Sequence, residues 1–264
     1  LRGVSITIEN GEFLGVIGHT GSGKSTFVQH LNGLLHPTTG TVTVNGVDIS
    51  ASTEEAKKMR HKVGMVFQYP EHQLFEETIA QDIAFGPKNL GLSADEVDER
   101  VRDAMKFVGL DYNTYAERSP FHLSGGQMRR VAIAGVVAMN PDFLVLDEPS
   151  AGLDPFGREE IFEEIIRLHK EKGITVILVS HNMEDISRMA SRLVVLDKGR
   201  IVLDGEPMDI FNNHRDELQA VGVDVPPVSV TMEYLREQGL DVSNRVLSVD
   251  DAVQAILEGG SHVK

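Results

Sequence analysis

Cysteine is absent from this chain of 264 residues, which excludes disulfides and thiolate metal sites and fits a reducing compartment. Long apolar runs are also absent: the longest, residues 131–139, has nine residues, whereas a membrane-spanning helix needs about 20. Basic residues are scarce, since 25 Lys and Arg stand against 40 Asp and Glu for a formal net charge of −15. A chain without a basic field is not expected to bind nucleic acid as its main ligand.

The composition that remains is that of a folded domain, with 41% hydrophobic and 25% charged residues. Short apolar runs that favour strands alternate with segments of helical spacing, so we predict an α/β fold built from βαβ units. The predicted strands are residues 1–8, 13–18, 41–46, 63–68, 143–146 and 175–179, with a hairpin at 192–205. The predicted helices of the same part are residues 24–35, 78–85, 94–108, 124–139 and 157–172.

Two segments depart from this alternation. Between about residues 78 and 139 three helices follow one another without a strand, which predicts a helical subdomain inserted at roughly residues 70–139. Residues 204–264 contain 12 acidic and 4 basic residues. This acidic stretch predicts a small C-terminal appendage over residues 206–264. Its two expected helices are residues 230–238 and 249–257, the second with Ser248 and Asp251 spaced as a helix cap.

The first chemical motif is the glycine-rich stretch at residues 18–25, which fits G-x-x-x-x-G-K-[ST] between a predicted strand and a predicted helix. Its glycines let backbone N–H groups converge on phosphate oxygens at the positive end of the helix. Lys24 then reaches the β- and γ-phosphates, and the Ser25 hydroxyl binds Mg²⁺. A turn that binds nothing is the competing interpretation. The candidate nucleotide-binding residues here are Gly18, His19, Thr20, Gly21, Ser22, Gly23, Lys24, Ser25 and Thr26.

A second motif places two carboxylates at the end of an apolar strand, at residues 143–148. Beside a phosphate loop, Asp147 is placed to hold the Mg²⁺ shell, and Glu148 to orient and deprotonate a water aimed at the γ-phosphate. A strand that ends in solvated acids is the alternative.

A third motif, LSGGQ at residues 123–127, opens a predicted helix 20 residues before Asp147. Ser124 is placed as the helix cap, and the glycines let a second anion approach the backbone. An ordinary Ser-capped helix is the alternative. The candidate contact residues are Ser124, Gly125, Gly126 and Gln127.

Together with Gln68, residues 150–154 and His181, these motifs resemble the ATP-binding cassette ATPases of ABC transporters, over nearly all of residues 1–205. The resemblance implies a P-loop NTPase fold of the ABC ATPase type with an inserted helical subdomain and an antiparallel β part. It also implies ATP and Mg²⁺, and two cassettes that meet head to tail, so that LSGGQ contacts the γ-phosphate held by the partner. The implied catalytic residues are Glu148, His181, Lys24 and Gln68, and the implied metal ligands are Ser25, Gln68 and Asp147.

Residues 68–78, 84–89 and 127–135 are similar, more narrowly, to the second ATPase of energy-coupling factor (ECF) transporters, which import vitamins and transition-metal ions. This similarity implies three partners at the cytoplasmic face of the membrane: a second cassette ATPase, which is either a paralogue or a second copy of this chain, a transmembrane coupling subunit and a substrate-binding membrane subunit. It also implies that residues 206–264 help to hold the ATPase pair together. Residues 69–91 contain four apolar side chains for a membrane partner, about half of them expected in the core: Leu74, Phe75, Ile79 and Phe85.

Three alternatives remain at this point. One is the ATPase of a cobalt or nickel importer, another is a soluble cassette protein that acts on nucleic acid or ribosomes, and the third is a small-molecule kinase. The last leaves LSGGQ and His181 unexplained. The family usually stacks adenine on an aromatic residue upstream of the first motif, yet no aromatic residue precedes Phe13. Because the chain does not begin with Met and residues 1–8 already alternate as a strand, we expect that residue in native sequence further upstream.

Overall fold

The computed structural model describes residues 1–260 and divides into two compact units. The first unit is Leu1–Ser25 with Ile177–Lys264, and the second unit is Thr26–Val176. Within the first unit the strand order is β1-β7-β8, and within the second unit β4 pairs with β5. Helix α1, Lys24–Leu31, and strand β6, Thr175–Val179, run across the division.

In the first unit, a buried parallel strand pair ends at the first motif. Strand β1, Phe13–Ile17, is buried at all five positions because it has no polar residue to place in water. It pairs in parallel with β7, Arg192–Asp197, with Ile17 opposite Val195. Strand β8, Arg200–Gly205, returns antiparallel to β7 and completes the predicted hairpin. The carboxyl ends of β1 and β7 therefore lie at the same edge.

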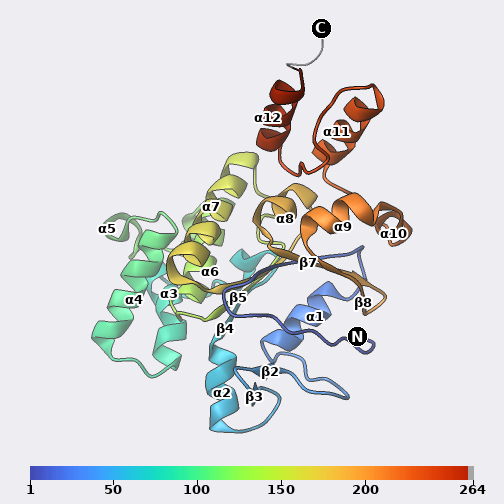
Figure 1. Cartoon of the computed structure of the whole chain (residues 1–264). Coiled ribbons are helices and arrows are strands. Elements are labelled where there is room, and N and C mark those ends of the chain that lie inside the picture. The colour runs from blue at the N-terminus through green and yellow to red at the C-terminus, as the bar shows by residue number, and fades with distance from the viewer. Residues whose placement is uncertain (261–264) are drawn as a thin grey trace. The chain divides into compact units, whose positions relative to one another are not determined.

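The rest of the first unit is helical and includes the C-terminal extension. Helices α11 and α12 lie next to each other (Figure 1) and enclose a small core of Met232, Val242, Val246 and Ala252. The Ser248 Oγ accepts from the Asp251 N–H at 3.1 Å, which confirms the predicted cap. Helices α9 and α10 were not expected from the sequence, and residues 261–264 of the extension lie outside the described residues. The helices are α8 Met183–Met189, α9 Pro207–Asn213, α10 Arg215–Ala220, α11 Pro227–Glu237 and α12 Val249–Gly260.

The second unit also contains a parallel strand pair. Strands β4, Val63–Val66, and β5, Phe143–Asp147, run in parallel with Val66 opposite Leu146, so both end at one edge. Strands β2 and β3 form a separate antiparallel pair. The remaining bounds are β2 Thr43–Val44, β3 Val47–Asp48, α2 Glu54–His61, η1 Pro70–Gln73, α3 Ile79–Asn89, α4 Ala94–Phe107, α5 Tyr112–Tyr115, η2 Pro120–His122, α6 Gly125–Val137 and α7 Pro155–Lys172.

The segment between β4 and β5 is helical, as the sequence predicts. Helices α3, α4 and α6 pack against one another within the second unit (Figure 1). Their starts follow from local chemistry, because Thr78, Ser93 and Ser124 each accept a hydrogen bond from a first-turn N–H. Ser93 and Ser124 form full capping boxes with Glu96 and Gln127.

Four sequence-based boundaries are corrected. Residues 1–8 form no strand, because their backbone makes isolated hydrogen bonds instead of a ladder with a neighbouring strand. For example, the Thr7 carbonyl accepts from the Arg192 side chain at 2.9 Å. Helix α1 ends at Leu31 rather than residue 35, since Gly33 takes a φ of 77°. Residues 41–46 do not form one strand, because a turn with positive φ at Asn45 and Gly46 separates β2 from β3. Helix α3 continues to Asn89, beyond the predicted end at residue 85, with Pro87 inside it.

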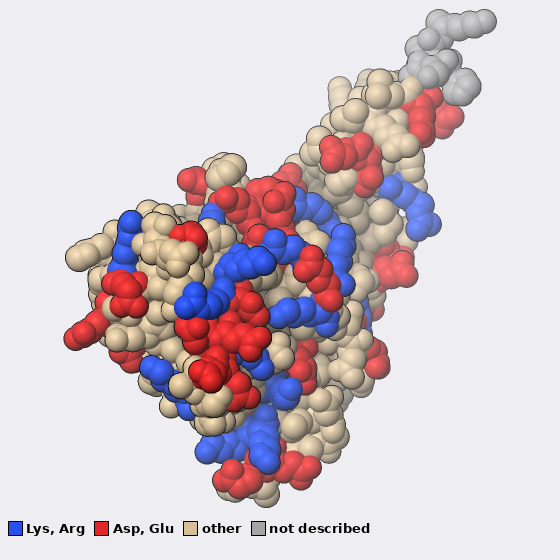
Figure 2. All heavy atoms as spheres, turned by 90° about the vertical axis from the view of Figure 1, so that its left-hand side faces the viewer, with Lys and Arg blue, Asp and Glu red and all other residues tan. Residues whose placement is uncertain are grey.

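Within the described residues, no helix has both the length and the apolar character required to cross a membrane. Figure 2 shows Lys and Arg side chains interspersed with Asp and Glu side chains on one face, rather than a continuous field of one sign.

Candidate active site

The phosphate-loop motif occupies the turn between β1 and α1, in the first unit. Lys24 is only 7% exposed, and its Nζ donates to the carbonyls of Gly18 at 2.6 Å and His19 at 3.1 Å. Gly18 has a φ of +151°, and a Cβ there would lie 2.3 Å from the Leu196 carbonyl oxygen. The loop therefore requires glycine at this position and holds its cation inside the turn.

The surroundings of Ser22 show whether this loop suits a phosphate group. Its side chain is fully buried, and among the described residues its Oγ has no hydrogen-bond partner. A buried hydroxyl without a partner costs free energy unless a ligand or water satisfies it. The buried hydroxyl and the inward-facing Lys24 fit a bound phosphate chain, with Ser25 exposed at the start of α1.

The turn after β7 contacts the loop, and no sequence pattern predicts this contact. The Asp197 Oδ1 and the His19 Nε2 lie 2.9 Å apart, and the Gly199 N–H donates to the Ser22 carbonyl at 2.7 Å. The first residues of the chain reach the same turn, where the Arg2 N–H donates to the Gly199 carbonyl at 2.7 Å. Asp197 and Gly199 therefore fix the loop although they lie about 175 residues away in the chain.

In the second unit, three predicted site residues follow neighbouring strand ends. Gln68 comes after β4, while Asp147 ends β5 and Glu148 follows it. Because the two strands are parallel, these side chains belong to one carboxyl edge, where α/β sheets bind ligands. Asp147 is 6% exposed and Glu148 is half-buried.

Glu148 also has a strained backbone. Its φ is 51°, in the left-handed region that residues with a Cβ adopt at a cost. Tyr69, directly after Gln68, has a φ of 57°. Such strain persists only where surrounding contacts hold it, and it concentrates at functional sites. Both strained residues adjoin or belong to the predicted catalytic set.

The LSGGQ motif begins α6 in the same unit, with Ser124 and Gln127 as the two members of the capping box. The Gln127 Nε2 donates to the Tyr115 hydroxyl at 3.3 Å, which holds the amide in place. A Cβ at Gly126 would lie 3.8 Å from the Leu153 side chain, so this helix start adjoins residues 150–154. The prediction that Ser124 caps a helix is confirmed.

His181 belongs to the first unit, where it follows β6 and is exposed. Asn182, the next residue, caps α8 through its Oδ1, which accepts from the N–H groups of Glu184 and Asp185. This cap fixes the backbone that presents His181.

Among the described residues, no group of three or more His, Cys, Asp and Glu side chains could hold a metal ion. Mg²⁺ commonly binds through one or two protein oxygens together with substrate phosphates and water, which does not require such a group. The predicted ligands are of this kind: one hydroxyl, Ser25, one amide, Gln68, and one carboxylate, Asp147.

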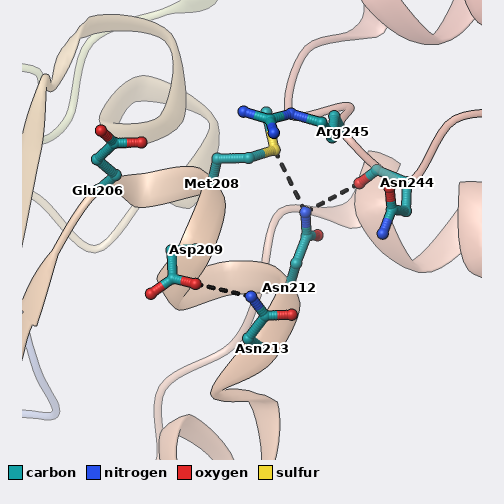
Figure 3. Close-up of a pocket in the computed structure, with 7 residues that line it drawn as sticks. All are labelled: Glu206, Met208, Asp209, Asn212, Asn213, Asn244 and Arg245. Carbon is teal, nitrogen blue, oxygen red and sulfur yellow. Dashed lines mark hydrogen bonds between the residues drawn. The ribbon is translucent and has the colours of Figure 1, made fainter.

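A pocket of about 510 Å³ lies elsewhere in the first unit, between α9 and residues 244–245. Figure 3 shows Asn212 between Met208 and Asn244, and the Asn212 amide donates to the Asn244 carbonyl at 2.9 Å. None of the predicted site residues lines this pocket. The nucleotide site is therefore not the pocket of Figure 3.

The buried cation in a glycine-rich loop, the carboxylates after a buried strand and the LSGGQ helix start define an ATP-binding cassette. Residues 1–151 match the family model described as ABC transporter. The chain belongs to this family of ATP-binding, ATP-hydrolysing cassettes, which confirms the predicted fold class and enzyme class.

The most informative relatives are ECF ATPases. The energy-coupling factor transporter ATP-binding protein EcfA2 of Clostridium tetani is 54% identical over 255 residues, which cover 97% of this chain and 88% of that protein. The protein of the same name from Clostridioides difficile is 51% identical over 258 residues, 98% of this chain and 90% of that one. The resemblance to the second ECF ATPase is thereby confirmed.

Two solved structures share the fold. The cbiO1 protein of Clostridium perfringens, part of the ABC transporter complex cbiONQ, has a TM-score of 0.74 at 37% identity, covering 88% of this chain and 92% of that chain. The ATP-binding cassette MJ0796, a dimer bound to ADP and Pi, has a TM-score of 0.68 at 30% identity, covering 76% and 88%.

Proposed function

We propose that this chain is the ATP-hydrolysing subunit of an ECF-type importer of vitamins or related micronutrients. The observation that carries the proposal is the 54% identity to an ECF ATPase over 97% of the chain. In this role the chain lies at the cytoplasmic face of the membrane and binds a transmembrane coupling subunit, which associates with a substrate-binding membrane subunit.

The proposed reaction needs two cassettes. The phosphate loop, Asp147, Glu148 and His181 of one chain form one side of the ATP site, and residues 124–127 of a second cassette complete it. Ser25, Gln68 and Asp147 would hold Mg²⁺, which would supply positive charge to neutralise the phosphates. Glu148 accepts the proton of the attacking water, and the closed pair excludes bulk water from the γ-phosphate. The dimeric MJ0796 cassette supports this arrangement.

The C-terminal extension has a surface suited to holding that pair together. Helices α11 and α12 leave large apolar side chains exposed, among them Val230 and Tyr234 on α11 and Val249 and Val253 on α12. Large apolar side chains that are exposed on neighbouring helices are suited to an interaction surface. We assign them to the contact between the two ATPase subunits.

The segment after Gln68 supplies the proposed contact for the membrane subunit. Phe75 and Phe85 are 57% and 46% exposed and pack edge to face at 4.9 Å between ring centroids, whereas Leu74 and Ile79 are buried. The expectation that about half of these four side chains belong to the core is confirmed. The Asp82 Oδ2 accepts from the Phe75 N–H at 2.9 Å, which fixes the backbone that presents the ring.

Replacing Phe75 by Asp is expected to abolish assembly with the membrane subunits and transport, because a carboxylate would be desolvated in an apolar contact. ATP affinity and thermal stability should stay at wild-type values, since the ring is exposed. Leu34→Asp is the matched control, because Leu34 is equally exposed at 57% and lies in the same unit. Co-purification from detergent-solubilised membranes measures assembly, and full assembly of Phe75→Asp would place the coupling surface elsewhere.

A further inference from the structure

One arginine that the sequence analysis did not single out is almost fully buried in the second unit. Arg129 lies on α6, five residues after the Ser124 cap, and is 2% exposed. An arginine cannot lose its charge in a protein, so its burial requires partners for its N–H groups. The identity of those partners shows what the guanidinium holds together.

The first partner is a carboxylate. The Arg129 Nε and Nη2 donate to the two Glu71 carboxylate oxygens, both at 3.1 Å, in the bidentate geometry that fits a guanidinium to a carboxylate. Glu71 lies in the short helix η1, three residues after Gln68. The guanidinium also lies 6.0 Å from the centre of the Tyr69 ring. Through these contacts Arg129 binds the segment that leads to Phe75.

The second partner is the backbone just after the predicted general base. The Arg129 Nη1 donates to the Pro149 carbonyl at 3.3 Å and also to the Ala151 carbonyl. These carbonyls belong to the turn that begins at Glu148, whose left-handed φ of 51° needs support from its surroundings. Arg129 supplies two hydrogen bonds to that turn.

We propose that Arg129 is a positioning residue: it fixes the turn after Glu148 so that the carboxylate faces the attacking water. Because Arg129 also binds Glu71, the position of this turn depends on the segment that contacts the membrane partner. The inference rests on the proposed function, because it assigns Glu148 as the base. Among side chains only a guanidinium provides five N–H donors in one plane, so Arg129 can bind a carboxylate and two carbonyls at once.

Arg129→Lys is the central test, because it retains the charge but cannot make this planar set of hydrogen bonds. We expect kcat for ATP hydrolysis to fall by on the order of 10–100-fold, the scale of a small misplacement of a catalytic group. The Kd for ATP should remain close to wild type. The thermal midpoint should fall, because buried acceptors lose hydrogen bonds, while the variant stays folded at the assay temperature. Arg102→Lys, at an exposed ion pair on α4, is the control for the same chemical change and should hydrolyse ATP at the wild-type rate.

A merely structural role predicts a different pattern. In that case Arg129→Lys lowers the ATP affinity together with kcat, and this result would overturn the proposal. So would a wild-type kcat in the folded variant. If Arg129→Lys does not fold, Glu71→Gln decides: a lower kcat at unchanged ATP affinity supports the proposal, and the wild-type kcat contradicts it.

The coupling between the two residues is measured by the double variant. If Glu71 acts through Arg129, the double variant loses no more kcat than Arg129→Lys alone, whereas independent roles give additive losses in activation free energy. The wild-type protein in the same series distinguishes a failure of the proposed function from a failure of the role inferred for Arg129. A wild type that is inactive with a second cassette present would contradict the proposed function itself, while an active wild type with a fully active Arg129→Lys contradicts this inference alone.

Discussion

Replacing Glu148 by Gln is expected to slow ATP turnover by on the order of 10²–10⁴-fold, the contribution of a positioned general base. The amide keeps nearly the same shape and still orients a water molecule, but it cannot accept the proton. ATP should therefore remain bound, and the two cassettes should stay closed around it. The side chain is half-buried at the end of β5, so the change is not expected to unfold the chain.

Two measurements check this prediction: steady-state release of phosphate, and gel filtration with and without ATP. Glu148→Gln should form a stable pair in the presence of ATP and Mg²⁺. Glu99→Gln removes one exposed carboxylate from α4 and serves as the control, with turnover at the wild-type rate. Wild-type turnover in Glu148→Gln would place the general base on another residue.

Replacing Lys24 by Ala should weaken ATP binding by on the order of 10²-fold, since two charge-assisted contacts to phosphates are lost. The structure shows why no neighbour can substitute: Lys24 is buried in the loop, with its Nζ against the Gly18 and His19 carbonyls. Ser22, buried beside it, is neutral.

Equilibrium titration with ATP in the presence of Mg²⁺ measures this effect. Lys106→Ala removes the same charge from an exposed position on α4 and should leave the affinity for ATP unchanged. Unchanged affinity in Lys24→Ala would mean that residues 18–25 form a turn without a role in nucleotide binding.

Short-range features of this chain could be predicted from the sequence. The phosphate-loop motif, the strand that ends at Asp147 and the capped helix after LSGGQ each depend on residues a few positions apart, so their patterns are visible in one window. For Leu74, Phe75, Ile79 and Phe85, the spacing predicted only that about half lie in the core, and it did not show that Leu74 is buried and Phe75 exposed. Helix α2 was missed because six of its eight residues are charged or polar, which leaves only Ala56 and Met59 to indicate a buried face.

Hydrogen bonds and ion pairs between residues far apart in the sequence could not be predicted in the same way. Arg129 meets Glu71 across 58 positions and the Pro149 carbonyl across 20, and His19 meets Asp197 across 178. No local pattern marks such pairs, because each partner alone is an ordinary charged residue. The failure at residues 1–8 has the same origin, since alternation predicts a strand only where a neighbouring strand edge accepts it.

The central claim is that each ATP site is completed by the LSGGQ motif of a second cassette. Mixing two inactive variants, Ser124→Arg and Lys24→Ala, tests it most directly. Ser124→Arg places its bulk in the site of the partner, and Lys24→Ala disables its own, so a mixed pair has both lesions in one site and the other site intact. The account predicts that each variant alone hydrolyses no ATP and that the mixture regains part of the wild-type activity. Full activity of Ser124→Arg alone, or of wild-type chains diluted to monomers, would contradict it.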